Sequence, residues 1–437
     1  MKTIKSKFST KILLGAALCI LSAFTLFIGC KHKADGGGIE KPQITIKVIG
    51  DDHVNVTKPN FKVPKGSNWA AVLAKAMQCV QYDTGWELQC WHFNDAEGTI
   101  LNNSYFGTFD MTATIFAESQ EAAMKVEGGI SMLLSHDKKE IIIEVATHDG
   151  SRVTVEGGSP SFIESGSETI ITATDTKVVL KGDLSAFSCG WTGTNNKIKS
   201  INFQGCLNLE RICCVTNKLT SINVENCKLL KELVCYDNQL TYINVKGCTN
   251  LSSFHCYYNQ LTSIDVYGLP LEYFDCGNNY LSELNVQDLL TLKNLSCHDN
   301  YLTELNVSDL INLESLICWR NQLTSINVKG LSALRRLSCP YNQLISVNIE
   351  GCDDLDELDL YINKLNEKTF IKILNDLPTR TVMYEGCRLY SEKIGTYEGN
   401  CTNFISSQEL KEAFENAKTV KKWKMYKINS NGQTVEI

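Results

Sequence analysis

One phrase of about 21 residues recurs through the middle of this 437-residue chain. Its asparagines follow one another at a step of 21 residues, once 20, and a degenerate copy begins at Asn196. The aligned asparagines are Asn217, Asn238, Asn259, Asn279, Asn300, Asn321, Asn342 and Asn363. Self-similarity at a short fixed period predicts a solenoid, because each unit buries its apolar face only by stacking on its neighbours.

Each unit reads L-x-x-L-x-C-x-x-N-x-L-x-x-I-N-V-x-G-C with small variations. The spacing of Leu233 and Cys235 predicts a short strand that points both side chains inward. Successive strands would stack as a parallel sheet, about 4.8 Å apart. The asparagine follows at the turn, where its amide can bond backbone groups that the turn leaves free. The phrase L-T-S-I-N-V alternates again and predicts a second extended arm, which leaves no room for a helix.

The cysteines of the repeat fall into two columns, and leucine occupies equivalent places in both. The first column is Cys214, Cys235, Cys256, Cys276, Cys297, Cys318 and Cys339, with Leu360 as its eighth member. The second column is Cys206, Cys227, Cys248 and Cys352, with Leu269, Leu289, Leu310 and Leu331 as its other members. A metal ligand or catalytic thiol would not tolerate leucine, so we interpret leucine and cysteine as freely exchangeable fillers of the core. Disulfides between coils are disfavoured. Side chains in register on stacked strands lie about 4.8 Å apart, whereas the Cβ atoms of a disulfide lie about 3.8 Å apart.

The repeat resembles the short bacterial leucine-rich repeat that is rich in N-Q-L-T-S-I-N/D-V phrases. The resemblance covers residues 189–365. It implies a mostly β chain with some α structure, built around a solenoid of about eight to nine short coils.

The chain begins with a basic segment, MKTIKSKFSTK, followed by an apolar run that ends at Cys30. The sequence F-I-G-C resembles a bacterial lipobox, although Phe27 stands where leucine is usual. The resemblance implies that residues 1–29 are a signal peptide, that Cys30 is acylated, and that Lys31 directs the protein to the outer membrane. An uncleaved membrane anchor is the alternative, because 18 apolar residues could span a bilayer. Residues 30–41 are polar and Gly-rich, which predicts a flexible tether.

Three further modules flank the repeat. Residues 42–118 follow a strand–helix–strands pattern, and their P-x-G-x-x-W phrase resembles the B-repeat module of internalin-type surface proteins, a small β-grasp. Cys79 and Cys90 could form a disulfide there, but we expect core residues. Residues 119–188 are strand-rich and predict a β-sandwich-like cap on the first coil.

Residues 366–437 predict an α/β C-terminal cap of alternating helices and strands. The first helix would end at Pro378 and the second would follow an N-cap signal near Ser407. Cys387 and Cys401 lie outside both columns, and a bridge between them is possible.

The sequence offers little catalytic or metal-binding chemistry. A formal net charge of −7 argues against nucleic acid as a partner. Phosphate-loop, dinucleotide-binding, zinc-protease and serine-hydrolase motifs are missing, so we predict neither an enzyme nor a cofactor nor a metal site. The acidic run from Cys352 to Asp359 could hold calcium, but its leucines keep the repeat spacing, which favours a solvated strand edge.

Surface residues then carry the functional prediction. We expect the residue after each ladder cysteine, and the residue after that, to lie outward on the open face of the sheet. The first such column is Val215, Tyr236, Tyr257, Gly277, His298, Trp319, Pro340 and Tyr361, and the second is Thr216, Asp237, Tyr258, Asn278, Asp299, Arg320, Tyr341 and Ile362. Aromatic and arginine enrichment is typical of binding surfaces, and rings that only stabilise the sheet are the alternative. The candidate partner-binding residues are Tyr236, Asp237, Tyr257, Tyr258, His298, Trp319, Arg320, Tyr341 and Tyr361.

Together these features predict a lipid-anchored, surface-exposed protein of a bacterial outer membrane. The family resemblance implies adhesion, with a host or microbial surface protein as partner. Glycan binding for nutrient capture is the alternative, because flat rings beside Asp237 and Asp299 also suit sugars. An enzyme would need a pocket between the caps that the sequence does not reveal.

Overall fold

The computed structural model describes residues 43–65, 67–68, 72, 75–82, 86–93, 108–109, 113–135, 140–190, 198–380 and 386–437. The predicted signal peptide, the acylated Cys30, the tether and Asn196, where the degenerate repeat begins, lie outside these residues.

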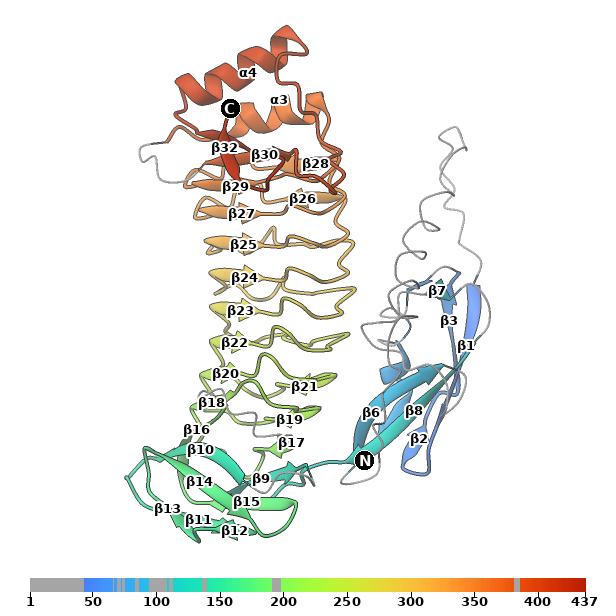
Figure 1. The fold of residues 1–437 in the computed structure, drawn as a ribbon, viewed down its shortest axis with the longest axis vertical. Helices are drawn as coiled ribbons and strands as arrows, with labels where there is room; N and C mark the ends of the chain where they lie inside the picture. Colours follow the sequence, from blue (N-terminus) through green and yellow to red (C-terminus); the bar gives the residue numbers. More distant parts are fainter. Residues whose placement is uncertain are drawn as a thin grey trace, which may run out of the picture. The chain divides into compact units, whose positions relative to one another are not determined.

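The first described module is a four-stranded sheet in the order β3-β1-β8-β6 (Figure 1). Its strands are β1 (Gln43–Gly50), β3 (Asn60–Pro64), β6 (Trp86–Phe93) and β8 (Ala113–Glu121), and two short pairs join β2 (Val54–Val56) to β5 (Val80–Tyr82) and β4 (Ser67–Asn68) to β7 (Thr108–Phe109). Strands β1 and β8 pair in parallel, β3 pairs antiparallel with β1, and β6 pairs antiparallel with β8. Cys79 is a buried free thiol, as expected for a core residue. The β-grasp assignment stays a prediction.

Two sheets of the N-terminal cap continue directly into the solenoid. The cap strands are β9 (Gly129–Leu134), β10 (Glu140–Thr147), β11 (Val153–Glu156), β12 (Gly158–Ser159), β13 (Phe162–Ile163), β14 (Ser167–Ala173), β15 (Lys177–Lys181) and β16 (Leu184–Cys189). Strand β16 pairs in parallel with β18, and β9 pairs antiparallel with β17. Each cap sheet therefore covers one side of the first coil, which would otherwise expose its apolar core.

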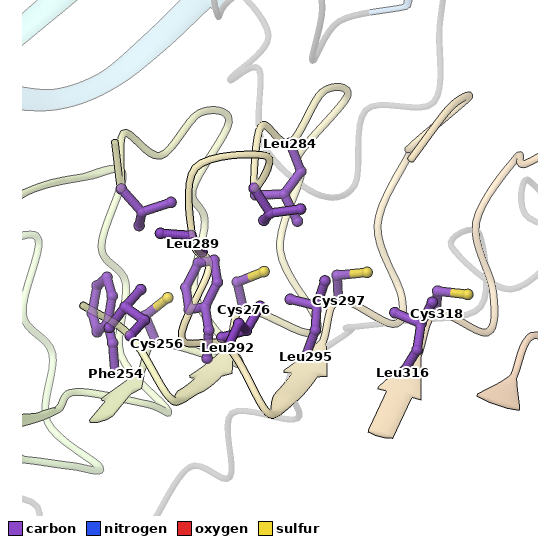
Figure 2. Packing of buried hydrophobic residues seen from close by; sticks show 14 of the residues in the cluster. Phe254, Cys256, Cys276, Leu284, Leu289, Leu292, Leu295, Cys297, Leu316 and Cys318 are labelled. Atoms are coloured by element: carbon purple, nitrogen blue, oxygen red, sulfur yellow. The ribbon is translucent and has the colours of Figure 1, made fainter. Parts of the chain in front are cut away.

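One side of the solenoid is a continuous parallel sheet of very short strands (Figure 1). These are β18 (Arg211–Cys214), β20 (Glu232–Val234), β22 (Ser253–His255), β23 (Tyr273–Asp275), β24 (Asn294–Ser296), β25 (Ser315–Ile317), β27 (Arg336–Ser338) and β29 (Glu357–Asp359). The central residue of each strand is buried, as Leu295 and Leu316 show in Figure 2. The predicted fold class, a mostly β chain built around a leucine-rich repeat solenoid, is confirmed.

The first cysteine column lies directly behind this sheet. Cys256, Cys276, Cys297 and Cys318 form a row in the core (Figure 2), and each is fully buried with a free thiol. Burial raises the pKa of the Cys318 thiol to about 12 and raises the pKa of the others well above the usual range. These thiols stay protonated at neutral pH and fill space.

The ladder asparagines lie in the turns that follow the strands. The side-chain amide of Asn259 donates to the carbonyls of Cys235, Cys256 and Tyr257 at 3.0, 3.1 and 3.3 Å. Its Oδ1 accepts the backbone N–H of Leu240 at 2.9 Å. One side chain thereby satisfies backbone groups of two adjacent coils, and the neighbouring asparagines repeat the pattern.

The second arms pair over only part of the solenoid. Arms β17 (Ile198–Asn202), β19 (Ser221–Asn223) and β21 (Tyr242–Asn244) pair with one another, as do β26 (Ser325–Asn327) and β28 (Ser346–Asn348). Within the described range 198–380, the arms of the three coils between β21 and β26, at residues 263–265, 283–285 and 304–306, form no strand (Figure 1). The predicted second arm is therefore a paired strand in some coils and is unpaired in these three.

The second column separates the paired arms from the unpaired ones. Cys227, Cys248 and Cys352 each donate a thiol hydrogen bond to a carbonyl of the preceding coil, at 3.7, 3.1 and 3.1 Å. Arms pair at these three coil junctions. At the four junctions between β21 and β26 the column instead holds Leu269, Leu289, Leu310 and Leu331.

We attribute this difference to side-chain size and hydrogen bonding. Leucine is bulkier than cysteine and donates no hydrogen bond, so it holds neighbouring coils apart on the arm side. Both residues are buried core fillers in the second column, as predicted, but we infer that they differ in their effect on the arms.

The C-terminal cap extends the solenoid with residues outside the repeat. Helices α3 (Glu367–Asp376) and α4 (Gln408–Thr419) begin after the N-caps Asn366 and Ser407. Strands β30 (Cys387–Ser391) and β31 (Met425–Ile428) continue the parallel sheet, and β32 (Thr434–Glu436), which the sequence did not predict, pairs antiparallel with β31. Cys387 and Cys401 are free thiols.

We expect the buried thiols of Cys256, Cys276, Cys297 and Cys318 to make stability fall at alkaline pH. Their folded pKa values lie above the unfolded value of about 8.5, so their contribution is complete below pH 8.5 and is lost as pH rises toward the folded values. Each of these four thiols should lower the unfolding free energy by about 1.4 kcal/mol per pH unit in that window. Urea denaturation between pH 7 and 10 measures the effect.

A variant with valine at Cys276, Cys297 and Cys318 is the control, and its stability should depend less steeply on pH. Equal slopes for the variant and the natural chain would contradict protonated, buried thiols.

Candidate functional site

The predicted binding columns lie in the turn after each strand and not on the strand. Strand β20 ends at Val234, so Tyr236 and Asp237 occupy the turn between Cys235 and Asn238. The open face of the sheet carries other residues, such as Val234. The reason is the asparagine, whose amide binds carbonyls of Cys235 and Tyr236 and turns the backbone away from the sheet.

We call this row of turns the turn edge, defined by the two predicted columns from Val215 to Ile362. Three of its members are not outward as predicted, since Val215, Gly277 and Pro340 are buried.

The second column of the turn edge has left-handed backbone throughout. The φ angles are 52° at Thr216, 57° at Asp237, 52° at Tyr258, 50° at Asn278, Asp299 and Arg320, 56° at Tyr341 and 57° at Ile362. This region favours glycine, and side chains other than Asn or Asp occupy it at a cost. Hydrogen bonds between coils hold the conformation, for example from Asp237 N–H to the Tyr257 carbonyl at 3.1 Å.

The first column stacks its rings along the solenoid. Tyr236 and Tyr257 stack at 4.3 Å between ring centroids, and His298 and Trp319 stack at 4.2 Å with 6° between their planes. Gly277 lies beside the His298 ring, where an added Cβ would come within 2.6 Å of Nε2. Many ring faces in this column therefore contact other rings of the protein. This agrees with the alternative interpretation, in which the rings stabilise the solenoid.

Charged groups are gathered around Arg320. Its guanidinium lies 5.4 Å from the Trp319 ring centroid, 5.1 Å from that of Tyr341 and 3.5 Å from a carboxylate oxygen of Asp299. Asp299 also lies 3.1 Å from Nδ1 of His298. Arg320 remains exposed, so it can contact a partner while its neighbours orient it.

A groove of 450 Å³ runs along part of the turn edge. Asp237, Tyr258, Asn278, Asp299 and Arg320 contribute to its wall, and ladder asparagines contribute to its floor. Tyr341 and Tyr361 are outside the groove, and their rings meet edge to face at 5.7 Å. Burial, followed by the nearby Asp359 carboxylate, raises the pKa of Tyr361 to about 12.

Part of this groove was not predicted from the sequence. Gln260, Tyr280 and Tyr301 also line it, and they occupy the position after each ladder asparagine. That position is polar or aromatic in every coil from Lys218 onward, which is the signal that could have revealed it.

The acidic run near the end of the solenoid forms ion pairs. Asp356 binds Arg335 at 3.0 Å, and Glu357 binds Arg336 at 3.0 Å. Asp359 is buried against Arg388 at 2.6 Å. Across the part of the chain that the structure describes, no group of three or more potential ligand side chains is placed to hold a metal ion, and no helix has the length and hydropathy of a membrane span.

Comparisons with known proteins give matches to solved structures. Neither a protein-family model nor a curated protein matches the chain.

The functional domain of InlJ from Listeria monocytogenes, which includes a cysteine ladder, is 25% identical over 50% of this chain and 52% of its own, with a TM-score of 0.38. A leucine-rich repeat protein of Leptospira interrogans is 24% identical over 43% of this chain and 52% of its own, with a TM-score of 0.37. YopM, a leucine-rich effector protein of Yersinia pestis, is 22% identical over 44% of this chain and 50% of its own, with a TM-score of 0.35. The chain thus spans about half the length of each of these structures.

Substitution of a turn-edge residue and of a ladder asparagine should distinguish a residue that the fold does not need from one that it does. We expect Asp237→Gly to leave the unfolding free energy unchanged or raise it by up to about 1 kcal/mol, because glycine relieves the left-handed backbone. Asn259→Ala should lower it by about 2 to 4 kcal/mol, because buried backbone groups lose their partner. Chemical denaturation measures both.

Asp237→Ala is the matched control and should bring no gain, since alanine keeps the unfavourable φ. A loss for Asp237→Gly as large as that for Asn259→Ala would mean that the aspartate has a structural role.

Proposed function

We propose that the turn edge is a protein-binding surface. The observation that carries the proposal is the left-handed column, in which coil after coil keeps a side chain where glycine would cost less. The fold does not need Asp237, Tyr258 or Arg320 at these positions, since their backbone N–H groups make the hydrogen bonds. Recognition of a partner explains why the side chains are there.

The chemistry of the edge favours a protein partner. Stacking already occupies ring faces in the first column, so a partner meets ring edges, the exposed Arg320 and the carboxylate of Asp237. Aromatic and arginine anchors beside polar groups are typical of protein interfaces. By its resemblance to bacterial surface repeats, the chain would attach to a host or microbial surface protein.

Glycan binding is the second candidate, and one observation favours it. The groove beside Tyr258 is lined largely by side-chain amides and carboxylates, which suit sugar hydroxyls. A glycan array and an array of host matrix and microbial surface proteins, probed with the same full chain, distinguish the two.

Removal of the anchors should weaken attachment without unfolding the solenoid. We expect Trp319→Ala and Tyr258→Gly each to cost about 2 kcal/mol of binding, roughly thirtyfold in affinity for the protein found on the array. Surface plasmon resonance measures the affinity, and urea denaturation shows whether the fold is kept.

Tyr267→Ala is the control, because Tyr267 is a ring that is 74% exposed and lies outside the turn edge. Binding that is unchanged in both edge variants, or lost equally in the Tyr267 variant, would remove the assignment of the site.

We further propose that the chain is lipid-anchored through Cys30 in a bacterial outer membrane and faces outward. In cells that express the chain with its leader, Cys30→Ala should abolish labelling by palmitate and move the protein from the membrane fraction to the soluble fraction. Protease added to intact cells should digest the natural chain. Palmitate labelling that survives Cys30→Ala would contradict the anchor.

A further inference from the structure

A second groove lies on the arm side of the solenoid, where the three unpaired arms occur. Its volume is 640 Å³. Leu284 and Leu305 contribute buried apolar side chains to it, and Figure 2 shows Leu284 on the side of the core away from the strands. Exposed Glu283, Glu304 and Asn306 contribute polar walls. This groove belongs to a different side of the coil from the turn edge, so it does not depend on the function proposed above.

The groove exists because the second column changes from cysteine to leucine. Arms pair at each junction that has a donating thiol, and they are unpaired at the four junctions that have leucine. In the described range 198–380, the backbone N–H groups at residues 263–265, 283–285 and 304–306 have no backbone partner. These arms therefore offer free donors and acceptors to a ligand.

The same three coils carry only negative charge on this side. Their arms and following turns, at residues 263–268, 283–289 and 304–310, hold five carboxylates and no lysine, arginine or histidine. The carboxylates are Asp265, Glu283, Asp288, Glu304 and Asp309. Glu283 and Glu304 occupy equivalent positions in adjacent coils, where like charges repel.

Several carboxylates elsewhere in the solenoid form ion pairs with lysines of adjacent coils. Glu210 binds Lys231 at 2.8 Å, Glu272 binds Lys293 at 2.7 Å, and Glu350 binds Lys329 at 3.0 Å. Across the described residues, none of the five carboxylates beside the groove has such an ion pair. Uncompensated charge of one sign makes the groove complementary to a cationic partner.

We propose that the arm-side groove binds an extended peptide segment rich in lysine or arginine. Glu283 and Glu304 would hold its cationic groups, while the alkyl stems of those side chains cover Leu284 and Leu305. The side-chain amides of Asn285 and Asn306, whose Oδ1 atoms already accept backbone N–H groups, would donate to carbonyls of the peptide. Free backbone groups of the arms supply the remaining hydrogen bonds, as in other modes of extended-peptide recognition.

The first experiment tests the charge. The full chain is titrated into a fluorescent peptide of alternating lysine and serine, with an alternating glutamate–serine peptide as the reference, and anisotropy is recorded. We expect the lysine peptide to bind, the glutamate peptide not to bind, and Glu283→Gln/Glu304→Gln to weaken binding about tenfold. Removing repulsion between the two glutamates should not harm folding.

The control changes net charge equally at another exposed acidic pair. Asp353→Asn/Asp354→Asn lies in the acidic run and should leave affinity unchanged. Equal weakening by the two double variants would reduce the effect to general attraction by an acidic protein and overturn the site. The site would also be overturned if spermine displaced the labelled peptide as effectively as the unlabelled lysine peptide does, because a polyamine has no peptide backbone.

The second experiment tests the role of leucine with every carboxylate left in place. Leu289→Cys/Leu310→Cys should let the coils approach, so that amides at 283–285 and 304–306 exchange hydrogen more slowly and peptide affinity falls about tenfold. Slower exchange with undiminished affinity would overturn the proposal that the open arms form the site. Unchanged exchange and unchanged affinity would overturn the role assigned to leucine.

Discussion

The hydrogen bonds of the ladder asparagines are the constraint on which the rest of the solenoid depends. From Asn238 to Asn363, each amide binds three carbonyls of two coils, as Asn259 does, and its oxygen accepts an N–H from the preceding coil. Without it, the turn would bury several unsatisfied backbone groups. Because the asparagine withdraws the backbone from the sheet, the strand is only three residues long in most coils. In the same turn, the residue before each ladder asparagine takes up left-handed backbone, and these residues form the second column of the turn edge.

The two sulfur columns have different physical roles. In the first column, thiols and the single leucine Leu360 are all fully buried, and the sheet in front of them is continuous. In the second column, a thiol donates to a carbonyl where the arms pair, whereas leucine donates no hydrogen bond and occupies the junctions where the arms are unpaired. The residue chosen in that column therefore sets the spacing of the arms, and a run of leucines opens one stretch of an otherwise uniform array.

The C-terminal end is closed by residues that imitate the repeat without its sequence. Cys387 on β30 aligns with Leu358 on β29, and Asn400 donates to the carbonyls of Leu360 and Leu389 at 2.8 and 2.9 Å while accepting Leu365 N–H at 2.9 Å. Asn400 thus continues the asparagine ladder from a loop, at a position that no spacing in the sequence would predict. Arg388 compensates the buried Asp359 beside it, although burial still raises the pKa of that carboxyl.

The sequence alone determined the solenoid, its period, its buried columns and the helices of its C-terminal cap, because these features follow from local spacing and from identity between coils. It also identified most members of the turn edge, since aromatic residues recur beside the cysteines. It could not show that these residues leave the sheet, because the strand ends where the Asn238 amide captures carbonyls, which depends on three-dimensional geometry. Only the tertiary structure decided which arms pair, since a cysteine and a leucine look equally apolar in the sequence but differ in how close they let two coils approach.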